Sequence, residues 1–191
     1  SNRGYLCLHC AAVRMDGGLL LFPGAHGVGK STLAAYLVSL GARLYADDIL
    51  FLELKNNHAM AAGALPRLRL PVPLGGNNVF DDFVNGRRGP ESDRFLYLNL
   101  GNGEMAPLGE TAPIRGIVHL GQGLAPVLKP AKKSTLLKQL ILGNFSHDLA
   151  AAHTLERLHS LINTVDRYTL EYTELKDAAT LLEGAFGPFR L

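Results

Sequence analysis

Residues 24–31 read GAHGVGKS, and this stretch decides the fold. It fits the pattern G-x-x-x-x-G-K-[ST] in full. The apolar residues 19–22 (LLLF) precede it, and residues 31–40 (STLAAYLVSL) have the composition and length of a helix that ends at Gly41. The motif therefore lies between a strand and a helix, the context in which it binds phosphate. The alternative is a glycine-rich turn that matches by chance.

Each part of this loop has a physical use toward a polyphosphate. Its glycines allow the backbone N–H groups to point inward, and the positive end of the following helix adds to that field. Lys30 is expected to neutralise the β- and γ-phosphates, and the Ser31 hydroxyl to bind Mg²⁺. The motif thus predicts ATP and Mg²⁺ as ligands. The predicted nucleotide-binding residues are Gly24, Ala25, His26, Gly27, Val28, Gly29, Lys30, Ser31 and Thr32.

Two adjacent acids follow the predicted helix. Residues 43–54 (RLYADDILFLEL) read as a strand that Asp47 and Asp48 interrupt. Such carboxylates are tolerated only near metal, hydrogen-bond donors or water. One carboxylate is suited to hold the Mg²⁺, and the other to accept a proton from an attacking hydroxyl. The alternative is a solvated turn.

The remaining pattern indicates an α/β domain. Residues 5–13 read as a first strand, and the turn at 15–18 (MDGG) leads back into the strand at 19–22. Strand, glycine loop, helix and strand form a βαβ unit, which implies a sheet covered by helices. Residues 75–94 are polar and predict a long loop, either a lid or a mobile connection. Further predicted strands are 68–72, 95–100 and 114–120.

The C-terminal part is predicted to be mainly helical. Ser134 is a suitable N-cap for a helix over 135–142, and Asp148 for a longer helix that ends near Thr164. An apolar stripe in the longer helix is formed by Leu155, Leu158, Leu161 and Ile162. A strand at 168–173 and a helix at 177–186 complete the chain. We expect one domain over 1–191, with a helix-strand-helix segment at about 134–191.

Composition excludes several classes of protein. The chain has 191 residues, of which 47% are hydrophobic and 19% charged, so wholesale disorder is excluded. The net charge of +2 and the scattered basic residues do not predict nucleic-acid binding. No apolar run is long enough to span a membrane, and we expect a cytoplasmic protein. Cys7 and Cys10 are expected to be buried core thiols rather than a metal or redox pair.

Together with the glycine loop, His9 and residues 41–48 (GARLYADD) resemble the C-terminal catalytic domain of bacterial HPr kinase/phosphorylase. That family has a histidine before a short hairpin, then the loop, a helix and R-L-x-A-D-D. Order and spacing agree over about residues 5–54. Residues 112–116 (APIRG) are similar to the family's L-E-I-R-G signature, and the C-terminal end resembles short HPr-kinase-like proteins.

This resemblance implies a fold shared with phosphoenolpyruvate carboxykinases, a P-loop kinase domain with a mixed sheet and flanking helices. It implies transfer of phosphate from Mg·ATP to serine of a protein or peptide, and it leaves a homo-oligomer open. By the same resemblance Lys30 and Asp47 are catalytic, with Asp47 as the proton acceptor, and His9 lies beside the reaction centre. Ser31 and Asp48 are then the metal ligands.

The sequence also departs from the family. Pro113 stands where the signature has a metal-binding glutamate, which argues against a second metal ligand and against phosphorolysis. The family's arginine-bearing loop has no counterpart, unless Lys129, Lys132 or Lys133 replaces it. An alternative function is therefore a nucleotide sensor or slow ATPase on the same fold. A small-molecule kinase or carboxykinase-like enzyme is a third, weaker reading.

Overall fold

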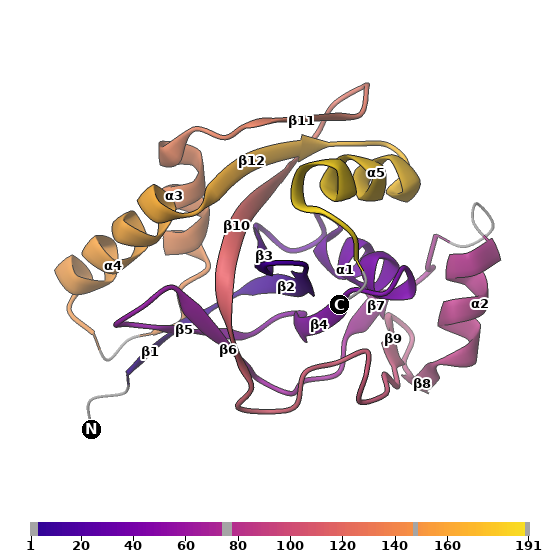
Figure 1. The fold of residues 1–191 in the computed structure, drawn as a ribbon. Helices are drawn as coiled ribbons and strands as arrows, with labels where there is room; N and C mark the ends of the chain where they lie inside the picture. The colour runs from indigo at the N-terminus through magenta and orange to yellow at the C-terminus, as the bar shows by residue number, and fades with distance from the viewer. Residues whose placement is uncertain (1–3, 74–77, 147–148, 190–191) are drawn as a thin grey trace.

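The structure is a computed structural model that describes residues 4–73, 78–146 and 149–189. Within this part of the chain, nine strands form one mixed sheet (Figure 1). Its main path runs β1-β5-β6-β10-β3-β2-β4, while β12 pairs with β10 and β11 pairs with β12. The strands are β1 (Tyr5–Leu8), β2 (Cys10–Met15), β3 (Gly18–Pro23), β4 (Arg43–Ala46), β5 (Leu50–Glu53), β6 (His58–Ala61), β10 (Thr111–Gly121), β11 (Val127–Pro130) and β12 (Asp166–Glu171).

Helices and a smaller sheet surround this large sheet. The smaller sheet has the order β7-β9-β8 and lies beside α1 and α2 in Figure 1. Its strands are β7 (Arg67–Arg69), β8 (Arg88–Glu91) and β9 (Phe95–Leu98). The helices are α1 (Lys30–Ser39), α2 (Asn78–Gly86), α3 (Lys133–Leu142), α4 (Ala151–Thr164) and α5 (Leu175–Phe186). In the described residues, no helix is both long and apolar enough to cross a membrane.

The large sheet separates two hydrophobic cores. Successive side chains of a strand point to opposite faces, and β3 follows this rule. Leu20 and Phe22 belong to the core that includes residues of α1 and α5. Leu19 and Leu21 belong to the core that includes residues of α3 and α4. Because both faces are covered by helices, the predicted α/β class with a mixed sheet and flanking helices is confirmed.

The strand directions bring separated segments to one edge of the sheet. β2 is antiparallel to both β3 and β4, so β3 and β4 run in the same direction with β2 between them. The loop after β3 and the acids after β4 therefore leave from the same edge. Cys10 pairs with Pro23, so His9 before β2 lies at this edge too. The predicted βαβ unit is present, although its two strands are not neighbours.

The hairpin turn at residues 15–18 is confirmed, whereas the single strand predicted over residues 5–13 is wrong. Residues 5–13 form two strands that are interrupted at His9, because β1 pairs with β5 while β2 pairs with β3 and β4. The turn lies where it is predicted, and Gly17 and Gly18 have φ values of 78° and 141°. Glycine adopts such values without the steric conflict that a Cβ causes.

The predicted loop over 75–94 is wrong over most of its length. It contains α2 and β8. Phe80, Phe83 and Val84 are buried, at the three- and four-residue spacing of one helix face. Neighbouring glycines and asparagines hide this short apolar face in the sequence. The strand predicted at 68–72 lies earlier, as β7, and β6 and β11 were not predicted.

Two predictions near the C-terminus need correction. Ser134 lies inside the first turn of α3, whose N-cap is Lys132. Leu155 is 46% exposed, and Thr154 is buried on α4 instead. The helix stripe therefore begins one residue earlier than the apolar pattern indicates. The predicted start at Asp148 lies outside the described residues.

The two cysteines differ in environment. Both are free thiols, and Cys10 is buried in the core whereas Cys7 is half-buried. The prediction of two core thiols is thus right for Cys10 and wrong for Cys7. Burial raises the pKa of the Cys10 thiol to about 12, which leaves it protonated at neutral pH and a poor metal ligand.

Replacement of Gly18 by alanine tests the hairpin. A Cβ at this position would lie 2.6 Å from the Pro113 carbonyl oxygen, and its φ is unfavourable for other residues. Backbone strain of this kind amounts to about 1–3 kcal/mol before the clash is added. We expect Gly18→Ala to lower the melting temperature by roughly 5 °C or more. The control Gly103→Ala, where a Cβ meets nothing within 4 Å, should be nearly neutral; equal losses in both variants would contradict this account.

Candidate active site

The loop between β3 and α1 leaves an anion-binding position at the start of the helix. Gly24, Gly27 and Gly29 have φ values of 153°, 82° and 96°, which let the backbone curl. Gly29 is also the N-cap of α1, and no described side chain caps the helix there. The first helical turn has no acidic residue. Its N-terminal amides and dipole are therefore suited to a negatively charged ligand.

The Lys30 side chain folds back on its own loop. Its Nζ donates to the carbonyl oxygens of Gly24 at 2.9 Å and Ala25 at 2.8 Å. Lys30 is only 6% exposed, and this burial lowers the pKa of its ammonium group. The positive charge is thus fixed inside the curl of the loop.

Asp47 is a buried carboxylate with one oxygen left over. It is 3% exposed, and its Oδ2 accepts a hydrogen bond of 2.9 Å from the Arg67 backbone N–H. Its Oδ1 accepts no hydrogen bond of ordinary geometry among the described residues, although the Ser31 side chain lies close enough to lower the pKa of the carboxyl group. A buried acceptor without a partner is unfavourable unless a ligand completes it.

Burial changes the acidity of Asp47. It raises the pKa of the carboxyl group above its ordinary value of 3.8. The Arg67 backbone N–H and the side chain of Ser31 act in the opposite direction, but burial is the larger effect. A carboxylate with a raised pKa is a stronger proton acceptor than one in water. Asp47 therefore has the environment of a general base.

Asp48 points to a different set of partners. Its Oδ1 lies 3.2 Å from His9 Nε2, and its Oδ2 lies 3.0 Å from a guanidinium nitrogen of Arg67. Its side chain is 33% exposed, so solvent and ligands can reach it. The two neighbouring acids thus diverge, one into the protein and one toward the cavity in front of the loop.

His9 is held firmly behind Asp48. Its backbone N–H donates to Gly143 O at 2.6 Å, and its ring lies against Phe145 with a centroid distance of 5.6 Å. It is 7% exposed. Burial lowers the pKa of its imidazole, and the nearby charge of Lys30 lowers it further. At neutral pH His9 is therefore an uncharged imidazole.

A cavity of about 650 Å³ opens in front of the loop. His26, Lys30 and Ser31 line it from the loop and helix α1, and Asp48 lines it from the end of β4. Arg67 and Arg69 of β7 line it from the other side, and sequence analysis missed both. The spacing of Arg67 and Arg69 in the sequence was a usable signal, because residues two apart on a strand point to one face. What the sequence does not reveal is that β7 packs opposite the loop.

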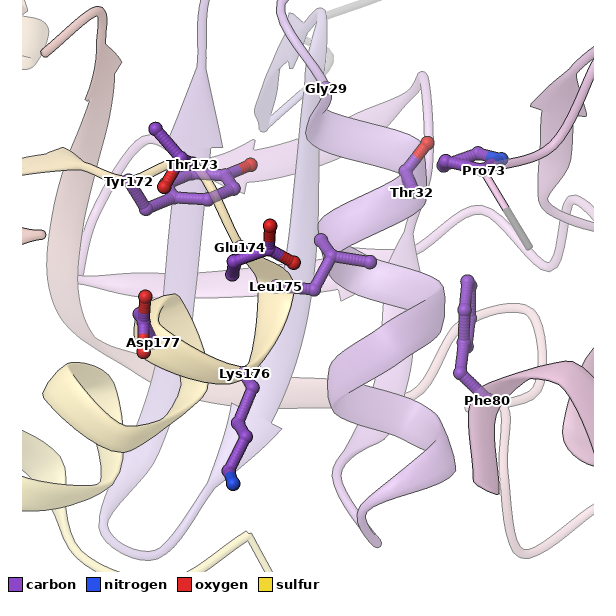
Figure 2. Close-up of a pocket in the computed structure, with 10 residues that line it drawn as sticks. All are labelled: Gly29, Thr32, Pro73, Phe80, Tyr172, Thr173, Glu174, Leu175, Lys176 and Asp177. Carbon is purple, nitrogen blue, oxygen red and sulfur yellow. The ribbon is translucent and has the colours of Figure 1, made fainter. Parts of the chain in front are cut away.

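A second cavity of about 430 Å³ adjoins the first and shares Gly29, Thr32 and Pro73 with it. Figure 2 shows it between the first turn of α1 and the connection from β12 to α5. Tyr172 lies on that connection, Leu175 begins α5, and the ring of Phe80 lies on the side of α2. The Tyr172 hydroxyl limits the space at the loop, since a Cβ on Gly29 would lie 3.3 Å from it.

Most residues predicted for the site come together at this edge. His26, Gly27, Gly29, Lys30, Ser31, Thr32 and Asp48 line the larger cavity. Gly24 and Ala25 bind Lys30, while Val28 is 40% exposed and does not line either cavity. Asp47 and His9 do not line either cavity. Asp47 directly precedes Asp48, and the His9 ring lies 3.2 Å from the Asp48 carboxylate, which does line the larger cavity. Their chemical roles remain predictions.

Residues from the signature-like stretch lie elsewhere. Pro113 pairs with His58 in the sheet, and Arg115 donates to Asp16 O at 2.6 Å and Phe186 O at 2.5 Å. Arg115 therefore joins the hairpin turn to the end of α5. Lys129 pairs with Glu171, and Lys133 bonds Asn163. None of these side chains lines the larger cavity.

Comparison with known protein families and with curated proteins gives no match. Among solved structures, the chain is similar to the Hpr(Ser) kinase/phosphatase from Coxiella burnetii. The two share 15% sequence identity, with a TM-score of 0.44 over 94% of this chain and 95% of that chain. A likeness at this level does not identify an activity or a set of site residues.

The burial of Asp47 predicts a stability effect with a defined pH dependence. Because the folded pKa is raised, folding favours the protonated acid, and stability is lost as pH rises from the unfolded pKa through the folded one. Asp47→Asn removes the free-energy cost of keeping a charged carboxylate buried. At pH 7 we expect the variant to melt at a higher temperature than wild type, because it carries no charge to bury. The difference should vanish below pH 4; a variant less stable at pH 7 than wild type would contradict the assignment.

Proposed function

We propose that this chain is a kinase that transfers the γ-phosphate of Mg·ATP to a hydroxyl group, with serine of a protein or peptide as the acceptor. One observation carries the proposal. A buried carboxylate oxygen without a partner among the described residues, Asp47 Oδ1, lies at the same sheet edge as the loop that carries Lys30 and Ser31. Phosphate binding and proton acceptance are thus available side by side.

The positive groups around the larger cavity support binding of a triphosphate. Lys30 and the amides at the start of α1 face it from one side. Arg67 and Arg69 face it from the other. Charge that develops on a transferring phosphoryl group is stabilised by such fixed cations, and arginine suits phosphate because it donates in a planar fork. We assign Arg67 and Arg69 to this role.

The oxygen ligands near the loop fit a magnesium ion. Mg²⁺ prefers oxygen donors and is held in such sites by one or two protein groups together with phosphates and water. The Ser31 hydroxyl and the Asp48 carboxylate line the same cavity and are the residues that would hold it. When bound there, the ion neutralises charge on the phosphate oxygens.

Asp47 is the proton acceptor in the proposed reaction. The acceptor hydroxyl oxygen forms a bond to the γ-phosphorus, the bond from that phosphorus to the leaving ADP oxygen breaks, and the hydroxyl proton passes to Asp47 Oδ1. A serine hydroxyl is a weak nucleophile, so a positioned base with a raised pKa is useful. The Arg67 backbone N–H holds the other carboxylate oxygen and so orients this base.

The second cavity is suited to the nucleoside of ATP. It begins where the larger cavity ends, at Gly29 and Thr32, and its volume of about 430 Å³ falls in the range of small-molecule sites. Phe80 and Leu175 offer apolar surface for a base, and Glu174 offers a hydrogen-bond acceptor. The two cavities together therefore have room for the triphosphate and for the nucleoside of ATP.

A nucleotide sensor without transfer is the second candidate. It is favoured by the pairing of Asp48 with Arg67 and of Lys30 with loop carbonyls, which leaves the charges satisfied in the absence of ligand. This candidate predicts nucleotide binding through Lys30 with no phosphate reaching any acceptor.

Nucleotide binding is tested first, because both candidates need it. Lys30→Ala removes a charged donor worth about 1.5–3 kcal/mol, so the dissociation constant for Mg·ATP should rise roughly 10- to 150-fold. Titration calorimetry measures this change. The exposed Lys138 of α3 supplies the matched control, Lys138→Ala, which should bind as wild type does. Equal affinity in all three proteins would rule out the loop as the phosphate site.

Phosphate transfer separates the two candidates. Labelled ATP is incubated with a serine-containing peptide library and with the same library carrying alanine at those positions. We expect label only in the serine library, and a loss of about 100-fold or more in rate with Asp47→Asn, as is typical when a general base is removed. ATP affinity should change little. The control Asp166→Asn alters an exposed acid at the start of β12. Transfer unaffected by Asp47→Asn would remove Asp47 from its role, and no transfer at all would favour the sensor.

A further inference from the structure

Three side chains of different origin converge beside the phosphate loop. His9 precedes β2, His26 lies in the loop after β3, and Asp48 follows β4. One ligand atom from each lies within 4.8 Å of the other two. Within the described part of the chain, this is the group of acid, histidine or cysteine residues whose positions suit a metal ion.

The distance between His9 and Asp48 matches that between two ligands of one metal ion. His9 Nε2 and Asp48 Oδ1 are 3.2 Å apart. Two neighbouring ligands that each lie about 2.0–2.2 Å from one ion are separated by about 2.8–3.1 Å in octahedral and about 3.3–3.6 Å in tetrahedral geometry. The rings of His9 and His26 have a centroid distance of 4.3 Å and an interplanar angle of 39°. His26 is exposed, so its ring is free of close packing on its outer side and can turn toward the other two ligand atoms, which lie within 4.8 Å.

In this candidate metal site His9 is held rigidly, and some coordination positions of the ion would remain open. His9 is fixed by its backbone hydrogen bond to Gly143 and by the ring of Phe145. His26 is exposed, and Asp48 faces the larger cavity. Water or a substrate oxygen can therefore occupy the remaining coordination positions, as in metal sites that take part in catalysis.

We propose that His9, His26 and Asp48 bind one divalent transition-metal ion that prefers imidazole ligands, such as Zn²⁺ or Co²⁺. Two imidazoles select against Mg²⁺, which prefers oxygen ligands and near-ideal octahedral geometry. Asp48 Oδ1 belongs to this ion. Its Oδ2, which pairs with Arg67, is the oxygen left for the magnesium of a nucleotide.

The proposed ion has a structural consequence for the phosphate loop. It would join His26 of that loop to two residues outside it, His9 and Asp48. The loop would then hold its curled conformation more firmly than glycines alone allow. Lys30 and Arg67 lie nearby and oppose a dication, so we expect moderate rather than very tight binding.

Titration of nucleotide-free protein with Co²⁺ tests this site. Visible absorption of the ion reports its ligands, and calorimetry gives affinity and stoichiometry. We expect one Co²⁺ per chain, displaced by Zn²⁺ and not by excess Mg²⁺. Removal of an outer-shell partner of a metal site already weakens binding by about 10- to 100-fold. His26→Ala should therefore weaken Co²⁺ binding at least tenfold.

Two control variants protect this test. His153→Ala removes an exposed histidine of α4, and Cys7→Ser removes the half-buried thiol two residues from His9; both should bind Co²⁺ as wild type does. His26→Ala should melt at the wild-type temperature, because this residue is exposed. His9→Gln supplies a second ligand variant. A loss below tenfold in His26→Ala, an equal loss in His153→Ala, or displacement by Mg²⁺ overturns the proposal. Since no nucleotide is present, the result does not depend on the proposed kinase activity.

Discussion

The hydrogen bond from the Arg67 backbone N–H to Asp47 Oδ2 holds the small sheet against the edge of the large one. Arg67 begins β7, and Asp47 directly follows β4. The same arginine pairs with Asp48 and lies over the ring of Phe95 in β9 at 4.8 Å. A buried carboxylate needs such a donor to be tolerated at all. The wall that faces the loop at residues 24–31 is therefore positioned by Asp47, the carboxylate that we propose as the base.

The site is arranged as alternating charges of opposite sign. Lys30 and Arg67 are positive, Asp47 and Asp48 negative, and each side chain or backbone N–H binds a defined partner. Local neutrality lets the protein hold four ionisable groups close together without a ligand. Under the proposed function, an incoming phosphate group would exchange partners with groups that are already in place. Little reorganisation is needed, which is what electrostatic preorganisation requires.

Local patterns in the sequence predict the parts of this molecule that depend on neighbouring residues. The hairpin at residues 15–18, the loop at 24–31 and helix α1 depend on glycines and short-range spacing, and the structure has all three. Asp47 and Asp48 can be recognised in the sequence because they interrupt the pattern of a strand. Helix α2 was missed because its apolar face is only three residues, Phe80, Phe83 and Val84, within a polar segment.

Other features are set by packing between distant segments and leave no local signal. Arg67 and Arg69 have an ordinary alternating pattern, and only the position of β7 opposite the loop gives them a place at the site. Leu155 continues an apolar periodicity yet is 46% exposed, because the sheet meets α4 along Thr154 and Leu158 instead. The pairing of His9 with Asp48 likewise depends on the fold and not on spacing.

Strand β10 has a mechanical consequence. Residues 111–113 pair with β6, Ile114 to Ile117 with β3, and Gly116 to Gly121 with β12. One continuous backbone thus links the antiparallel and parallel regions of the sheet. The load between β6 on one side and β3 and β12 on the other therefore passes through the covalent backbone of β10, so the stiffness of the large sheet depends on this strand.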